Sequence, residues 1–146
     1  MTRKEAMRRT HLNDTLRALG FTDAEAESLR RISMTLHRWH ELECGIDNGC
    51  VERNEATNEA FWHNSHTGQY TKIADRETGA RKRLAKILTE RNERCESGSG
   101  TRFTANFLSA YVQTDPRGAA LYILRPGDVP EGEDAGAYYS RGICVY

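Results

Sequence analysis

Apolar residues in the first half of the chain recur every three or four positions, a spacing that is typical of amphipathic helices. This spacing predicts helices over residues 4–19 and 23–44, with Gly20 ending the first. Thr22 and Glu25 match a capping box at the start of the second helix. The two helices are therefore expected to pack as a helical hairpin.

A third helix is predicted over residues 76–94, and Asp75 stands before it as a suitable N-cap. Its outer face carries mostly Lys and Arg, which is typical of a solvated surface and also suits contact with phosphates. The inward-facing residues of this helix are predicted to be Ala80, Leu84, Ile87, Leu88 and Arg91.

The region 49–73 changes to the alternating pattern of strands. Two polar turns, which begin at Asn54 and Asn64, separate three short strands in this region. The sequence therefore predicts a small antiparallel unit between the second and third helices.

A further β-hairpin is predicted in the last third of the chain, where residues 110–114 would pair with 119–124. The connecting turn is Asp115-Pro116-Arg117-Gly118, in which Asp accepts backbone hydrogen bonds, Pro presets φ and Gly supplies a positive φ. Residues 138–146 are expected to form a terminal strand that pairs with this hairpin.

These elements predict an α+β fold in which three helices pack on a small, mostly antiparallel sheet. A chain of 146 residues suits one domain and buries roughly 70% of the surface that its unfolded form exposes. The single domain 1–146 is expected to divide into a helical hairpin, a β-hairpin region, a helix and a β-meander, over residues 1–45, 49–73, 75–95 and 103–146.

Charge and composition exclude several classes of protein. Lys plus Arg equals Asp plus Glu at 21 each, which argues against a protein that binds polyanions over its whole surface and against an acidic DNA mimic. Carboxylates in the first turn of helix 23–44 would repel phosphates and disfavour a DNA-binding helix-turn-helix. The chain has neither a membrane-length apolar run nor a signal-peptide pattern, so a cytoplasmic protein is expected.

The four cysteines are too scattered for a disulfide scaffold and are expected to be thiols or metal ligands. The candidate zinc ligands are His40, Cys44 and Cys50, with further histidines at 37, 63 and 66. Zinc ligands usually come in closely spaced pairs, and the five residues between Cys44 and Cys50 fit no zinc knuckle or ribbon. No cofactor is therefore expected, and zinc is kept as an alternative.

A weaker pattern suggests acid–base chemistry. His40 and Glu41 stand beside Glu43 on the second helix, and Asp115 or Asp128 would approach from the sheet. This set would suit a small hydrolase or nuclease, although the chain has no nucleophile elbow, HExxH motif, P-loop or dinucleotide fingerprint.

An anion-binding site is the third candidate. Arg117, Arg125 and Arg141 are placed on one predicted sheet, and tyrosines, among them Tyr139, lie close to them in the sequence. Guanidinium groups bind phosphates in a bidentate way and tyrosine rings stack on bases, which indicates a nucleotide or another phosphate-bearing ligand. The same arginines would alternatively pair with carboxylates of the protein itself, such as Asp115.

Several segments from residue 29 onward together resemble a family of small uncharacterised proteins from tailed phages and prophages. The resemblance is carried by residues 39–45, 75–80, 82–84, 114–129 and 138–143. It implies a phage accessory protein and brings no assigned activity.

The expected function is that of a non-enzymatic phage binding protein in the cytoplasm of the bacterial host. It would antagonise a host process, such as an antiviral defence, by binding a host protein or a phosphate-bearing or nucleotide ligand. The alternatives are a small hydrolase or nuclease that uses His40 and Glu41, and a virion or assembly component. An exposed terminal strand would also permit a homo-oligomer.

Overall fold

The structure is a computed structural model that describes residues 1–96, 107–115 and 118–145. Its helices are α1 (Arg3–Ala18), α2 (Asp23–Cys44) and α3 (Arg76–Glu96), close to the predicted bounds. Its strands are β1 (Gly49–Arg53), β2 (Ala60–Asn64), β3 (Tyr70–Lys72), β4 (Ser109–Asp115), β5 (Gly118–Leu124) and β6 (Ile143–Val145). The α+β class predicted from the sequence is confirmed.

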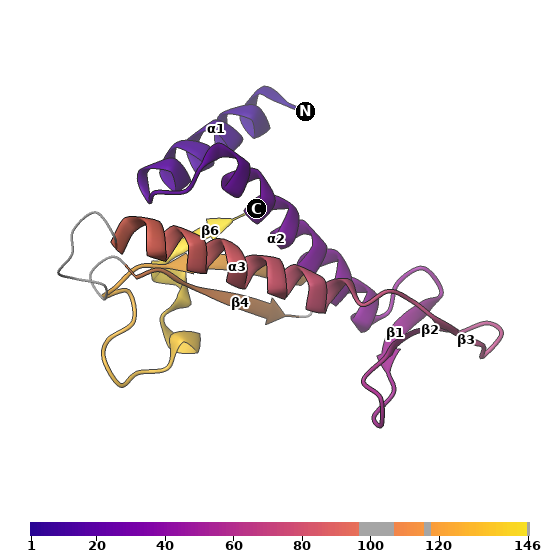
Figure 1. Cartoon of the computed structure of the whole chain (residues 1–146). Helices are drawn as coiled ribbons and strands as arrows, with labels where there is room; N and C mark the ends of the chain where they lie inside the picture. Colours follow the sequence, from indigo (N-terminus) through magenta and orange to yellow (C-terminus); the bar gives the residue numbers. More distant parts are fainter. Residues whose placement is uncertain (97–106, 116–117, 146) are drawn as a thin grey trace.

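The strands are divided between two antiparallel sheets, of order β1-β2-β3 and β4-β5-β6, rather than gathered in one. Figure 1 shows β1 to β3 beyond the C-terminal end of α2, at a distance from the sheet of β4 to β6, which lies beside α2 and α3. Among the described helices, none combines the length and the hydropathy that a membrane span requires.

Helix α2 connects the two sheets because both hydrophobic cores lie along it. Its N-terminal part contributes Leu29, Ile32 and Leu36 to the larger core, which also contains residues of α1, α3, β5 and β6. Its C-terminal part contributes Trp39, which is 2% exposed and packs with Val51 and other residues of the first sheet. Burying these side chains provides the main stabilisation of both sheets.

The predicted capping box of α2 is present. The Thr22 hydroxyl accepts a hydrogen bond from Glu25 N at 3.1 Å, and the Glu25 carboxylate accepts one from Thr22 N at 2.8 Å. The same box occurs at α1, between Thr2 and Glu5, on an exposed end of the chain.

Thr22→Ala is expected to lower the free energy of unfolding by about 1 kcal/mol, because the first turn of α2 loses its cap next to the buried Ala26. Thr2→Ala removes the same hydrogen bond from an exposed first turn that can fray at little cost. Urea unfolding of the two variants measures the difference. Equal losses of stability would contradict this account.

The two turns of the first sheet have the same construction. The side-chain oxygens of Asn54 and Asn64 each accept two backbone hydrogen bonds within their own turn. Each turn then ends on a residue with positive φ, Asn58 at 61° and Gly68 at 75°. The polar turns predicted at these two asparagines are thereby confirmed.

The predicted hairpin is confirmed in β4 and β5, which pair from Ser109↔Leu124 to Asp115↔Gly118. The turn residues 116 and 117 lie outside the described residues. The predicted strand over 138–146 is too long, because only Ile143–Val145 is a strand and Tyr139–Arg141 is a short 3-10 helix. The chain folds over the sheet at this point, because the Tyr139 ring packs against two tyrosines of β4 and β5.

Candidate functional site

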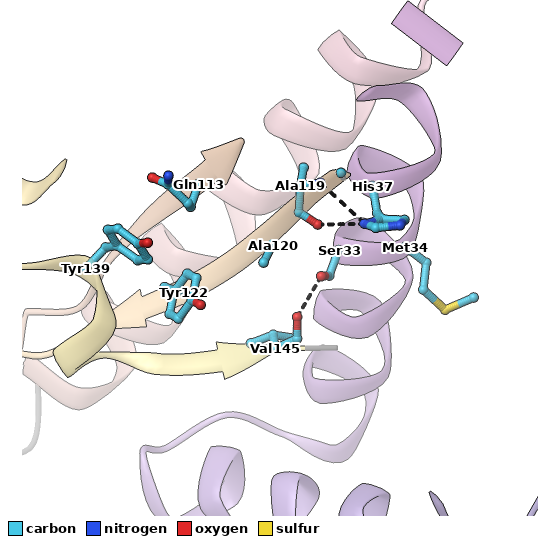
Figure 2. Close-up of a pocket in the computed structure, with 10 residues that line it drawn as sticks. Ser33, Met34, His37, Gln113, Ala119, Ala120, Tyr122, Tyr139 and Val145 are labelled. Carbon is cyan, nitrogen blue, oxygen red and sulfur yellow. Dashed lines mark hydrogen bonds between the residues drawn. The ribbon is translucent and has the colours of Figure 1, made fainter. Parts of the chain in front are cut away.

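A groove of about 570 Å³ lies between α2 and the sheet of β4 to β6. Figure 2 shows its helical wall on one side and the strands β5 and β6 on the other. Its volume falls within the range of small-molecule sites. The lining residues are Ser33, Met34, His37, Gln113, Gly118, Ala119, Ala120, Tyr122, Tyr139 and Val145.

The edge of β5 borders the groove, next to the outer face of the sheet that carries Gln113, Ala120 and Tyr122. Strand β6 pairs with β5 at three positions, of which Leu121↔Val145 is nearest the groove. Backbone groups of alternate residues point to the same side of a strand, so those of Ala119 face the side on which β6 lies. Ala119 therefore presents its N–H and C=O to the groove.

His37 of α2 occupies this edge in place of a neighbouring strand. Its Nδ1 lies 3.0 Å from Ala119 O and 3.3 Å from Ala119 N. A ring nitrogen either donates to the carbonyl or accepts from the amide, so at any moment it satisfies one of the two groups. Its Nε2 lies 3.7 Å from the Glu41 carboxylate.

Gly118 permits this close approach of the helix to the strand. Its φ is +148°, and a Cβ built at this position would overlap the imidazole of His37. Glycine adopts such a φ without strain and leaves room for another group. The turn glycine predicted from the sequence thus also shapes the groove.

The helical wall carries groups of two kinds. The Ser33 hydroxyl donates a hydrogen bond of 2.6 Å to Val145 O and attaches β6 to α2. Met34, one position further along, is 66% exposed. Methionine is flexible and polarisable, and such side chains adapt to different apolar partners.

Tyrosines form the other end of the groove. Tyr139 stacks on Tyr111 with the ring centroids 5.5 Å apart, and meets Tyr122 edge-on at 4.9 Å. In Figure 2, Tyr122 and Tyr139 lie at the far end of the groove from His37. Tyr139, predicted as a ligand-binding residue, is therefore in the groove and already in contact with other rings.

Of the predicted anion-binding arginines, the structure describes Arg125 and Arg141, and both side chains make contacts within the protein. The Arg125 guanidinium contacts the Asp128 carboxylate at 3.1 Å and donates to the Arg141 carbonyl at 2.8 Å. The Arg141 guanidinium lies over the Tyr138 ring, 4.6 Å from its centroid. Arg117 lies outside the described residues. Arg125 therefore pairs with a carboxylate of the protein itself, which is the alternative that the sequence left open.

The predicted acid–base residues are distributed over separate contacts. His40 Nε2 lies 3.5 Å from Cys44 Sγ, whereas Glu41 faces His37. Burial, together with the nearby Glu77 carboxylate, raises the pKa of Glu43. Asp115 pairs with Gly118 through the backbone, and its side chain is outside the described part of the chain. Asp128, the other predicted partner, holds Arg125.

The predicted zinc ligands also divide into two groups. His40 and Cys44 contact each other on α2, and Cys50 lies on β1 beside Glu52 and His63. Among the described residues, the one group of three metal-ligating side chains whose donor atoms lie within 4.8 Å of one another is Cys50, Glu52 and His63.

No family model, curated protein or solved structure matches the chain. The groove is therefore identified as the candidate site from its geometry alone. Sequence reasoning missed Ser33 and Met34 as lining residues. A signal for Ser33 was available, because it follows Ile32 on the buried stripe of α2, and a small polar residue there requires a partner from another element.

Proposed function

We propose that the protein is a non-enzymatic binding protein that captures an extended segment of a host protein in the groove between α2 and β5. The segment adds to the edge of β5 at Ala119, next to β6, and its side chains contact the helical wall. Recognition by strand addition uses backbone hydrogen bonds for affinity and neighbouring pockets for specificity.

The observation that carries this proposal is the contact between His37 and Ala119. Both backbone groups of Ala119 face the groove, and one imidazole nitrogen serves them in place of a strand. An added strand supplies a donor and an acceptor together when the ring rotates away. Met34 and Val145 give the same groove an apolar lining.

A protein ligand fits the groove better than a nucleotide does. Phosphate recognition needs guanidinium or ammonium groups that are available to the ligand. Arg125 is engaged by Asp128 and by the Arg141 carbonyl, and neither Arg125 nor Arg141 lines the groove. The lining is mainly apolar, with the polar groups of Ser33 and His37 on the helical wall and that of Gln113 on β4.

The biological setting that we propose is that of a phage accessory protein which antagonises a process of its bacterial host, such as an antiviral defence. This part rests on the resemblance of the chain to small phage and prophage proteins. The groove supports the binding component of the proposal.

Met34→Glu is expected to weaken binding of an extended peptide at least about tenfold, because a charge then replaces the adaptable apolar side chain of the helical wall. Ligands are selected from a displayed library of overlapping bacterial peptides, and their affinities are measured by fluorescence anisotropy. Met7→Glu is the matched control, because Met7 of α1 is also 66% exposed.

Selected peptides that bind both glutamate variants as well as the wild type would refute the groove as the binding site. Light scattering of the free protein tests whether a second copy of the chain takes the same edge instead. Phage plating on host cells that express wild type or Met34→Glu then tests the proposed antagonism.

A further inference from the structure

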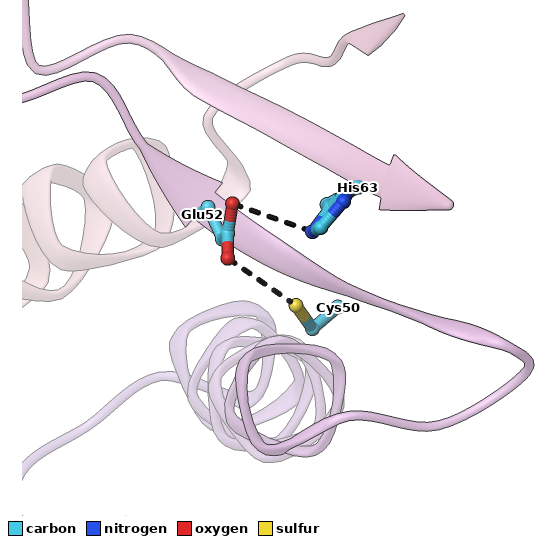
Figure 3. Close-up of side chains that lie close together, drawn as sticks. All are labelled: Cys50, Glu52 and His63. Atoms are coloured by element: carbon cyan, nitrogen blue, oxygen red, sulfur yellow. Dashed lines mark hydrogen bonds and ion pairs between the residues drawn. The ribbon is translucent and has the colours of Figure 1, made fainter. Parts of the chain in front are cut away.

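We infer that Cys50, Glu52 and His63 form a zinc site on the exposed face of the first sheet. The inference is independent of the groove, since the groove lies beside the middle of α2 and the sheet of β1 to β3 lies beyond its C-terminal end. Figure 3 shows the three side chains converging from the two adjacent strands β1 and β2.

Strand register brings these residues together. Cys50 of β1 is directly opposite His63 of β2, and Glu52 is two residues after Cys50. Side chains two apart on a strand, and those directly opposite on its neighbour, lie on one face of the sheet. Val51, between the two β1 ligands, faces the other way and is buried against Trp39.

The donor atoms lie close enough together to be brought to one metal ion, since one atom from each of the three residues lies within 4.8 Å of the other two. His63 Nδ1 lies 3.6 Å from one Glu52 carboxylate oxygen, and Cys50 Sγ lies 3.9 Å from the other. Ligands about 2.0–2.3 Å from a tetrahedral zinc ion are separated by about 3.3–3.7 Å. Small rotations of the side chains therefore suffice to close the site.

The donor set favours zinc over magnesium and calcium. A thiolate and an imidazole are ligands of zinc rather than of magnesium or calcium, and a carboxylate completes many zinc sites. Three protein ligands leave a fourth position, and Glu52 at 46% side-chain exposure leaves that position open to solvent.

A neighbouring tyrosine orients the histidine ligand. The His63 ring stacks on Tyr70 of β3, with the centroids 4.3 Å apart and the planes within 5°. This stacking restricts the rotation of the His63 imidazole.

The test is titration of the untagged, metal-free full chain with zinc by calorimetry, and with cobalt by absorption spectroscopy. We expect one equivalent to bind and cobalt to give a thiolate charge-transfer band. Cys50→Ser and His63→Ala should each weaken zinc binding by more than about tenfold, because removal of a ligand weakens binding more than removal of a residue that only orients one. Circular dichroism of the metal-free variants verifies that each is folded.

Cys44→Ser and His66→Ala are the matched controls and should bind zinc as the wild type does. Cys44 pairs with His40 on α2, and His66 lies in the turn after β2. Absence of zinc binding by the wild type would overturn the inference. So would a loss of binding in Cys44→Ser, or unchanged binding in Cys50→Ser.

Discussion

Gly118→Ala is expected to lower the free energy of unfolding by about 3 kcal/mol, measured by urea unfolding followed with circular dichroism. Two costs add at this position. The backbone φ of +148° strains any residue with a side chain, which costs about 1–3 kcal/mol. The new Cβ also overlaps the His37 imidazole, and forcing atoms into occupied space costs about 1–3 kcal/mol.

Gly127→Ala separates the two costs. Gly127 also has a positive φ, at +90°, but its Cβ would meet nothing within 4 Å. This variant should therefore lose about 1 kcal/mol, the cost of backbone strain alone. The double variant His37→Ala/Gly118→Ala should recover part of the loss, because the overlapping ring is absent. Equal losses in Gly118→Ala and Gly127→Ala would show that α2 does not approach β5 as described.

Local signals explain why the helices could be predicted well. The caps at Thr22 and Asp75 and the glycine after α1 are decided within a few residues, and the observed α2 has the predicted bounds. The β4–β5 hairpin is equally local, because its turn sequence joins the two strands directly.

The division of the strands into two sheets could not be predicted in the same way. It depends on the length of α2, along which the two hydrophobic cores lie one after the other. Periodicity shows that Leu36 and Trp39 face inward, but it carries no information on which strands cover each of them. Sheet assignment is a tertiary property of this chain.

Tertiary hydrogen bonds also could not be predicted from the sequence. Asn92 of α3 donates to Leu108 O at 2.9 Å and accepts from Leu108 N at 3.0 Å, so a helix side chain pairs with the backbone just before β4. Arg91, predicted as an inward residue, is buried and donates to Leu19 O at the end of α1. The polarity of Asn92 was visible in the sequence, but its partner was not.

The groove was not predicted from the sequence, for the same reason. Tyr139, which the sequence predicts as a ligand-binding residue, lines one end of the groove, where it stacks on Tyr111 and meets Tyr122 edge-on. His37 was noted as a metal ligand, and its contact with Ala119 joins residues 82 positions apart in the chain. The periodicity of the sequence does not reveal contacts between residues so far apart in the chain.

Arg53→Met is expected to lower the free energy of unfolding by about 2–3 kcal/mol. The Arg53 guanidinium holds both oxygens of Asp75, at 2.7 and 3.1 Å, and thereby ties β1 to the start of α3. The side chains of Arg53 and Asp75 are 25% and 27% exposed, so part of the larger cost of breaking a buried ion pair applies.

Arg17→Met is the control for Arg53→Met. Arg17 contacts Asp14 and Asp23, but its side chain is 58% exposed. Exposed pairs contribute about 0–1 kcal/mol, so this variant should differ little from the wild type. A similar loss in both variants would contradict a special role of Arg53 in attaching the first sheet.

Asp75→Asn should reveal the same ion pair through the dependence of stability on pH. The hydrogen bonds from Arg53 hold the pKa of the Asp75 carboxyl well below its ordinary value of 3.8. A carboxyl whose folded pKa is depressed stabilises the protein above the unfolded pKa, and this contribution is lost as pH falls toward the folded value. The asparagine keeps an oxygen that can cap Thr78 N but carries no charge.

The difference in unfolding free energy between wild type and Asp75→Asn should therefore be constant from about pH 5 to pH 7 and decrease below about pH 4. Urea unfolding at a series of pH values measures this difference.

Glu43, near Arg53, acts in the opposite sense, because burial and Glu77 raise its pKa and its protonation favours the folded state. Comparing two proteins that both retain Glu43 largely removes this contribution. A difference that stays the same at pH 3 would mean that the ion pair between Arg53 and Asp75 contributes no net stability, and that the cap of α3 alone accounts for Asp75.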